Sequence, residues 1–75
     1  MSSNFDKELH KKFGLRVKQI RKSKKLTQEA LSLMIGADNS YIAIIENAHR
    51  DIPLSKIQKI ASALGVEIAE LFNFR

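Results

Sequence analysis

Apolar side chains recur every three or four positions along most of this sequence, and no stretch alternates apolar and polar residues in the way a half-buried strand requires. One proline and three glycines are all that interrupt the pattern. A chain of 75 residues can build only one small core, with much of its surface left in water. The sequence therefore predicts a single all-α domain spanning residues 1–75.

The helical spacing divides the chain into five segments, which predicts a compact five-helix bundle. The first helix covers about residues 6–24, with an inward stripe of Leu9, Phe13, Val17 and Ile20. A second helix begins with Thr27 as its capping residue and ends at Gly36, and its apolar residues are Ala30, Leu31, Met34 and Ile35. A third helix begins with Asp38 as its cap and ends around Asn47.

Pro53 suits the first turn of a fourth helix, because proline lacks only an amide hydrogen that would be unpaired there. This helix ends at Gly65, and its expected inward stripe is Leu54, Ile57, Ile60, Ala61 and Leu64. The tail, residues 66–75, has room for one last short helix. Its apolar residues either cap the core or form a surface for a partner; they are Leu71, Phe72 and Phe74.

The sequence lacks the residues that several functional classes of protein require. The sequence has no cysteine, and His10 and His49 lie far apart without a carboxylate at ligand spacing, so we expect no metal and no other cofactor. Neither a nucleophile–base pair, nor paired carboxylates, nor a glycine-rich phosphate loop is found, which argues against an enzyme. The N-terminus is polar and no apolar run approaches the ~20 residues of a membrane span, so we expect a cytoplasmic protein.

Basic residues are concentrated in the first third of the chain. Nine of the thirteen lysines and arginines fall between Lys7 and Lys25, where Glu8 is the only acidic residue. With a net charge of +5 and a pI near 9.8, this distribution favours an anionic partner such as nucleic acid. A well-solvated helix surface is the alternative explanation of the same lysines.

Residues from about 27 to 47 fit two short helices joined by a tight turn, with Gly36 where a left-handed conformation is commonly needed. A helical wheel directs one side of the third helix inward, namely Tyr41, Ile42, Ile45 and Glu46. The opposite side carries short or polar groups with one isoleucine at its edge, namely Asn39, Ser40, Ala43, Asn47 and Ile44. Such a ridge can enter a DNA groove, where asparagine pairs with adenine and isoleucine can touch a thymine methyl group.

The stretch FGLRVKQIRKSKKLTQEALSLMIGADNSYIAIIENAHRDIPLSKIQKIASALGVEIAELF resembles the Xre or Cro-repressor type of helix-turn-helix domain over almost the entire chain. Within that type, the SYI pattern, the EN ending of the third helix and the ALxxxxxELF tail are most similar to the small controller proteins of restriction-modification systems. The resemblance implies a sequence-specific regulator of transcription that binds double-stranded DNA.

The resemblance also assigns roles to individual positions. The implied base-reading residues are Asn39, Ser40, Ala43 and Ile44. The implied phosphate contacts come from Thr27, Gln28, Tyr41, Asn47, His49 and Arg50. An implied structural ion pair joins Arg21 to Glu46. Two residues keep ordinary alternatives, since Gln28 could be a polar first-turn residue without a partner and Tyr41 could belong to the core.

Three features depart from the family pattern. Ile44 stands where relatives often place a long polar or basic residue, and Ala48 replaces the usual glycine after the third helix. Because alanine resists positive φ, we expect a slightly different exit from that helix. Leu33 and Met34 are more apolar than is usual on their side, for which we favour packing in the core over a contact surface.

The implied partners are duplex DNA and a second copy of the chain, with no membrane and with contact to RNA polymerase as a further option. The predicted dimer interface consists of Ile68, Leu71, Phe72 and Phe74. A dimer of this kind would read a near-palindromic operator with half-sites ~34 Å apart. The alternative function is a protein-interaction module, such as a helical antitoxin or adaptor, whose apolar C-terminal face docks a partner and whose lysines only aid solubility.

Overall fold

The computed structural model describes residues 6–74, so residues 1–5 and Arg75 of the predicted domain lie outside the described part. The described residues form the helices α1 (Lys7–Ser23), α2 (Gln28–Met34), α3 (Tyr41–Glu46) and α4 (Leu54–Leu64), followed by the 3₁₀ helix η1 (Ile68–Phe72). No strand occurs among them, as predicted. The prediction of five α-helices is wrong in its last element, where five residues close into a tighter 3₁₀ helix.

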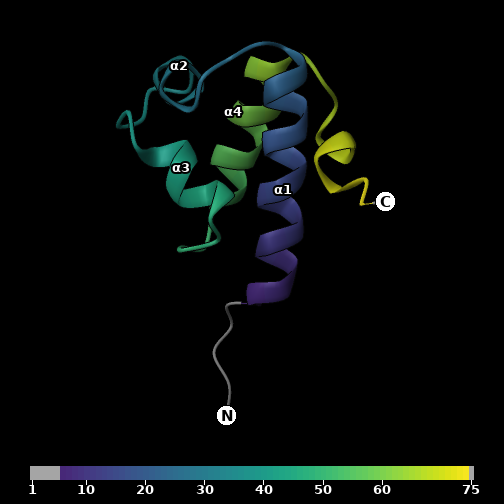
Figure 1. The fold of residues 1–75 in the computed structure, drawn as a ribbon. Coiled ribbons are helices and arrows are strands. Elements are labelled where there is room, and N and C mark those ends of the chain that lie inside the picture. Colours follow the sequence, from purple (N-terminus) through teal and green to yellow (C-terminus); the bar gives the residue numbers. More distant parts are fainter. Residues whose placement is uncertain (1–5, 75) are drawn as a thin grey trace.

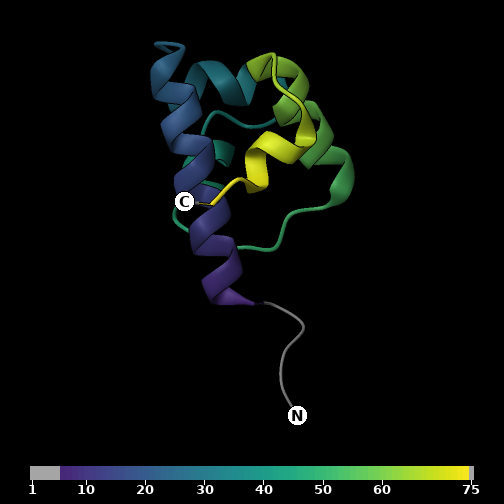
Figure 2. The ribbon, with the colours of Figure 1, turned by 90° about the vertical axis from the view of Figure 1, so that its right-hand side faces the viewer.

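α1 is the central element of the domain. Figure 1 shows α2 and α3 on one side of α1 and η1 on the other, and Figure 2 shows η1 lying across the side of the molecule formed by α1 and α4. The core between them consists of Phe13, Val17, Ile20, Leu31, Ile35, Ile42, Ile45, Ile57, Ile60, Ala61, Leu64 and Leu71. None of the helices in residues 6–74 is long and apolar enough to cross a membrane.

All four α-helices end in the same hydrogen-bonded motif, in which a residue with positive φ lets two consecutive amides return to the last turn. After α3, for example, Ala48 N–H donates to the carbonyl of Ile45 and His49 N–H donates to that of Ile44, both at 3.1 Å. The left-handed residues are Lys25, Gly36, Ala48 and Gly65. The expected change of exit at Ala48 is therefore wrong, because the alanine adopts the left-handed conformation, with φ 57°.

The apolar stripes extend beyond the core at several helix ends. Leu9, Met34 and Leu54 were expected to face inward, but all three are exposed. Leu33 is 67% exposed, so the expectation that it packs in the core is also wrong. Ser32 is the side chain of α2 that is buried next to Leu31 instead.

Candidate nucleic-acid interface

The third helix begins later than the sequence suggested. Asp38 was predicted to cap it, but α3 starts at Tyr41 and the residue before it is Ser40, whose side chain makes no capping hydrogen bond. Asp38 contributes only its backbone carbonyl, which accepts from Tyr41 N–H at 2.9 Å. Asn39 and Ser40 consequently lie in the turn that leads into α3 and not within the helix.

The proposed base-reading side chains nevertheless lie on the accessible side of this turn and helix. Asn39 and Ser40 are exposed, whereas Ala43 and Ile44 are half-buried. Ile42 and Ile45 point into the core on the opposite side. The structure therefore brings the four candidates into one surface, with the polar pair at its N-terminal end and the apolar pair beyond it.

A buried ion pair fixes the C-terminal end of α3. Arg21 Nε donates to Glu46 Oε2 at 2.7 Å and Arg21 Nη2 donates to Glu46 Oε1 at 3.1 Å, and the two side chains are only 7% and 2% exposed. Gln28 Nε2 donates to the same Glu46 Oε1 at 2.9 Å, and Arg21 Nη1 donates to the carbonyl of Leu26 at 2.7 Å. The Glu46 carboxylate thus ties α1, the start of α2 and the end of α3 together.

Gly14 allows α1 to approach this same end of α3. A Cβ atom on Gly14 would lie 2.6 Å from the carbonyl oxygen of Glu46 and 2.7 Å from that of Ile45. Backbone atoms cannot move aside as a flexible side chain can, so only glycine fits. The sequence showed Gly14 as a mid-helix residue of low helix propensity; its packing role depends on a contact that sequence spacing does not reveal.

Polar and basic side chains surround the exposed surface of α3. Tyr41 is half-buried at its start; burial raises the pKa of the Tyr41 hydroxyl, and the positive charge of Arg50 acts in the opposite, lowering direction. Lys56, from α4, places its Nζ 5.6 Å from the centre of the Tyr41 ring. Tyr41 therefore keeps its proton at neutral pH and can donate a hydrogen bond beside two cations, an arrangement suited to a phosphate.

The other phosphate candidates have different roles in the fold. Thr27 Oγ1 accepts from Ala30 N–H at 2.9 Å and so caps α2, while the Gln28 amide braces Glu46. Asn47, His49 and Arg50 are exposed in the segment after α3. That segment is fastened to α1 through His10, whose Nε2 lies 2.8 Å from Asp51 Oδ1.

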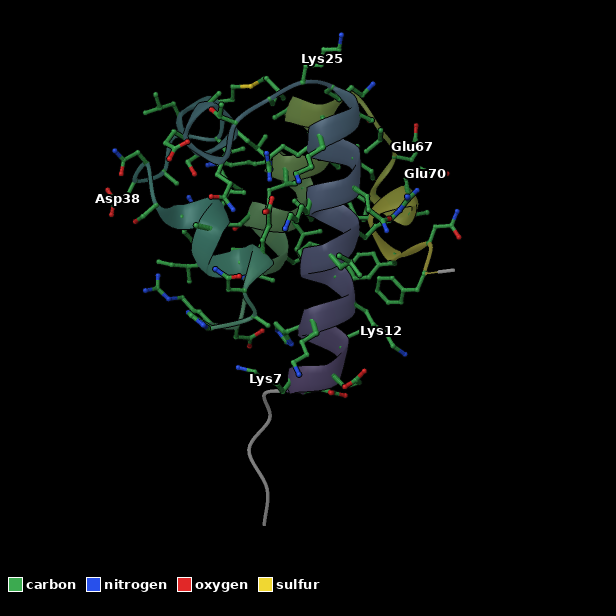
Figure 3. The ribbon with its side chains drawn as sticks, in the orientation of Figure 1. Lys7, Lys12, Lys25, Asp38, Glu67 and Glu70 are labelled. Atoms are coloured by element: carbon green, nitrogen blue, oxygen red, sulfur yellow. The ribbon has the colours of Figure 1, made fainter. Side chains whose placement is uncertain are left out.

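Four exposed lysines of α1 lie on the flank that faces α3. At about 100° per residue they fall within an arc of about 60°, next to Gly14 and Arg21, which contact α3; they are Lys7, Lys11, Lys18 and Lys22. Figure 3 shows Lys7 and Lys12 on different sides of α1, with Glu67 and Glu70 on the side of η1. We call the four residues the lysine stripe.

Known helix-turn-helix sequences match this chain over the same elements. The model of the helix-turn-helix family matches residues 17–71, which include α2, α3 and the turn between them. This protein belongs to the Xre-type helix-turn-helix family of DNA-binding transcription regulators.

The helix-turn-helix protein is similar to several controller proteins along most of their length. It is 38% identical over 63 residues to control protein C.MunI of a Mycoplasma species, covering 83% of this chain and 85% of that protein. It is 41% identical over 63 residues to control protein C.BamHI of Bacillus amyloliquefaciens, covering 83% of this chain and 78% of that protein. The resemblance to Xre-type domains and to controller proteins is thus confirmed.

Solved structures of related proteins show the same fold. The crystal structure of the restriction-modification controller protein C.AhdI from Aeromonas hydrophila has a TM-score of 0.81 and 41% identity, covering 84% of this helix-turn-helix chain and 91% of that one. A hypothetical transcription factor from Neisseria has a TM-score of 0.85 and 29% identity, covering 99% and 86%.

The candidate dimer residues of the helix-turn-helix protein divide into two groups. Ile68 and Phe72 are each 39% exposed, and Phe74 is half-buried with its ring 6.1 Å from that of Phe72. Leu71 is fully buried within its own chain, so its assignment to a dimer surface is wrong and it belongs to the core. Arg16 holds η1 in place by donating to the Glu70 carbonyl at 2.7 Å and to Glu70 Oε1 at 3.0 Å.

Sequence reasoning missed three residues that contact α3. Lys56 approaches Tyr41 from α4, Gly14 meets the end of α3, and Ser32 accepts a hydrogen bond from Ile42. The glycine alone gave a signal, because a mid-helix glycine commonly has a packing or functional reason. Within residues 6–74 no group of three or more His, Cys, Asp or Glu side chains could hold a metal ion.

Proposed function

We propose that this protein is a cytoplasmic, non-enzymatic controller of transcription that binds a near-palindromic operator as a homodimer, in the manner of a restriction-modification controller. Each subunit would place α3 and the preceding turn in the major groove, with half-sites ~34 Å apart. Regulation would follow from occupancy of the operator, with contact to RNA polymerase where the protein activates.

One observation carries the proposal: the exposed residues Asn39 and Ser40 lie in the turn that leads into α3, a helix whose far end is fixed by the buried Arg21–Glu46 pair. A rigid support is needed because base contacts depend on register and orientation. Asparagine pairs bidentately with adenine, and Ile44 offers an apolar contact for a thymine methyl group.

Affinity would come mainly from the rim of this surface. Gln28, Tyr41, Asn47, His49 and Arg50 are the proposed phosphate contacts, with Thr27 at the start of α2, and Lys56 extends the set. Each neutralised phosphate releases counterions, so binding should weaken steeply as salt rises. The lysine stripe adds long-range attraction without sequence information.

A selection from a random duplex library at two salt concentrations tests the proposal. The wild-type protein is expected to enrich a two-fold symmetric motif, and the variant Asn39→Ala, Ser40→Ala is expected to lose that enrichment while keeping salt-dependent binding. If the wild type enriches nothing, or the variant keeps the same motif, sequence-specific reading by this surface is wrong.

The second candidate is a helical antitoxin or adaptor. It is supported by the exposed apolar residues Leu33 and Met34, 67% and 54% exposed, which lie on α2 and not on the C-terminal face expected from the sequence. It predicts function that is insensitive to salt and to Asn39→Ala. A change of Leu33 to Ser would abolish function in that case, whereas operator binding should tolerate it.

A further inference from the structure

The hydroxyl of Ser32 lies outside the surface described above, yet it contacts α3 directly. Ser32 is on α2 and none of its surface is exposed to solvent. The backbone N–H of Ile42 donates a hydrogen bond to Ser32 Oγ at 3.0 Å, and Ile42 is equally buried. Water therefore cannot replace Ser32 as the acceptor without entering the core.

This hydrogen bond replaces the N-terminal cap that α3 lacks. Amides in the first turn of a helix have no acceptor within the helix, and the N-cap side chain usually accepts from the second or third residue. Ser40 occupies the N-cap position but makes no such bond. Ile42 is the second residue of α3, and its acceptor comes instead from the preceding helix. A helix of six residues is marginal by itself, so its first turn depends on such support.

We infer that Ser32 is a positioning residue for sequence reading, because its hydroxyl fixes the first turn of α3 and the adjoining Asn39 and Ser40. This inference rests on the proposed function. The opposite end of α3 is held independently by Glu46, so loss of the Ser32 hydroxyl releases only the end that carries the polar base contacts. Ser32 itself is buried and touches no DNA.

The test compares association constants for the selected operator and for an unrelated duplex, in the wild type, Ser32→Ala and Ile57→Val. A hydrogen bond of ordinary net strength corresponds to about a 3- to 10-fold change in an equilibrium constant. Ser32→Ala should lower by this factor the ratio of the association constant for the operator to that for the unrelated duplex. The association constant for the unrelated duplex should stay unchanged, because phosphate contacts supply that binding. Ile57→Val, the matched control, trims the core in α4 and should keep the wild-type ratio.

A second variant and a second measurement keep the inference testable if Ser32→Ala folds poorly. Ser32→Cys keeps nearly the same size but offers only a weak acceptor, so its ratio should fall between those of wild type and Ser32→Ala. Hydrogen exchange of the Ile42 amide, measured without DNA, should become faster in the same order.

Three results would overturn the inference: a folded Ser32→Ala with the wild-type ratio, an equal loss on both duplexes, or the same loss in Ile57→Val. Failure of the proposed function looks different, because the wild type would then show no preferred duplex at all. Ser32 would then have no base contacts to position, and the role proposed for it would be wrong as well.

Discussion

At the scale of single residues, the left-handed conformations of two non-glycine residues are a source of local strain. Lys25 has φ 59° and Ala48 has φ 57°. A side chain in this region costs about 1–2 kcal/mol relative to the right-handed conformation. The methyl group of Ala48 is buried, so its packing offsets part of that cost, whereas Lys25 is exposed.

Replacing Lys25 by glycine should therefore stabilise the protein. We expect Lys25→Gly to raise the free energy of unfolding by about 0.5–1 kcal/mol, since the strain relieved exceeds the added freedom of glycine in the unfolded chain. Lys24→Gly is the control, because Lys24 is also exposed but has φ −93°, and it should lose stability. Urea unfolding of both variants measures these changes in the free energy of unfolding. Equal losses of stability in the two variants would contradict the strain assigned to Lys25.

At the scale of helices, the position of α3 depends on contacts from both α1 and α2. Gly14→Ala removes the space that α1 leaves for the backbone of Glu46, and only backbone atoms stand in the way. We expect Gly14→Ala to lower the free energy of unfolding by about 1–3 kcal/mol, because the clash outweighs the roughly 1 kcal/mol that alanine gains in helix propensity. Lys12→Ala, at an exposed position of α1, should stay close to wild type in the same thermal unfolding measurement. A stabilised Gly14→Ala would show that the two helices are not in close contact.

A second prediction at the scale of helices concerns the Arg21–Glu46 pair. Glu46→Gln leaves a buried guanidinium without its counter-charge, which should cost about 3 kcal/mol or more. The double variant Arg21→Met, Glu46→Leu removes both charges and should recover most of that loss. Denaturant unfolding of Arg21→Met, of Glu46→Leu and of the double variant gives the coupling free energy. A coupling near zero would mean that the pair does not act as a unit.

The contact between His10 and Asp51 connects α1 to the segment that carries Arg50, and it is sensitive to pH. The hydrogen bond from His10 holds the pKa of the Asp51 carboxyl below its usual value near 3.8. The stability that this carboxylate contributes is thus fully present above that pH and is lost as the pH falls through the lower, folded-state pKa. The stability difference between wild type and Asp51→Asn should shrink below about pH 4. In a His10→Ala background this change with pH should become smaller without vanishing, because the backbone N–H of Ile52 still donates to Asp51 and lowers its pKa.

Sequence periodicity predicted where helices occur better than where they begin or which residues they bury. Thr27 caps α2, and Gly36 and Gly65 adopt positive φ after α2 and α4, as expected. These features were predictable because capping and left-handed turns are local properties. Leu9 and Leu54 follow the inward spacing, yet they lie in the first turns of their helices, beyond the edge of the core. Ser32 as a cap of α3 could not be predicted, because the donor and acceptor are joined only by tertiary packing.

At the scale of the whole molecule, α3 and η1 lie on different sides of α1 (Figure 1). The α3 side is polar and bordered by the lysine stripe, whereas the η1 side exposes Ile68 and Phe72. A protein with a net charge of +5 should not associate through its basic side, because like charges repel. The apolar side is therefore the better candidate for the dimer, and it leaves both α3 helices free for DNA.

A charge on that apolar surface should separate the subunits. Two-fold symmetry would bring a carboxylate introduced at position 68 close to the identical carboxylate of the partner, so Ile68→Glu should raise the dimer dissociation constant at least about tenfold. Ile68 is preferable to Phe72 for this purpose, because the Phe72 ring packs 5.1 Å from that of Phe13 in the core. Leu33→Glu, at an exposed leucine of α2, is the matched control and should remain dimeric.

Sedimentation equilibrium distinguishes the outcomes, since the wild type should sediment at twice the 8.5 kDa of the single chain. The monomeric variant should also lose most of its operator affinity while binding unrelated DNA as before, because one subunit can occupy only one half-site. If Ile68→Glu stays dimeric, the interface lies elsewhere, and loss of dimerisation in Leu33→Glu would move it to α2.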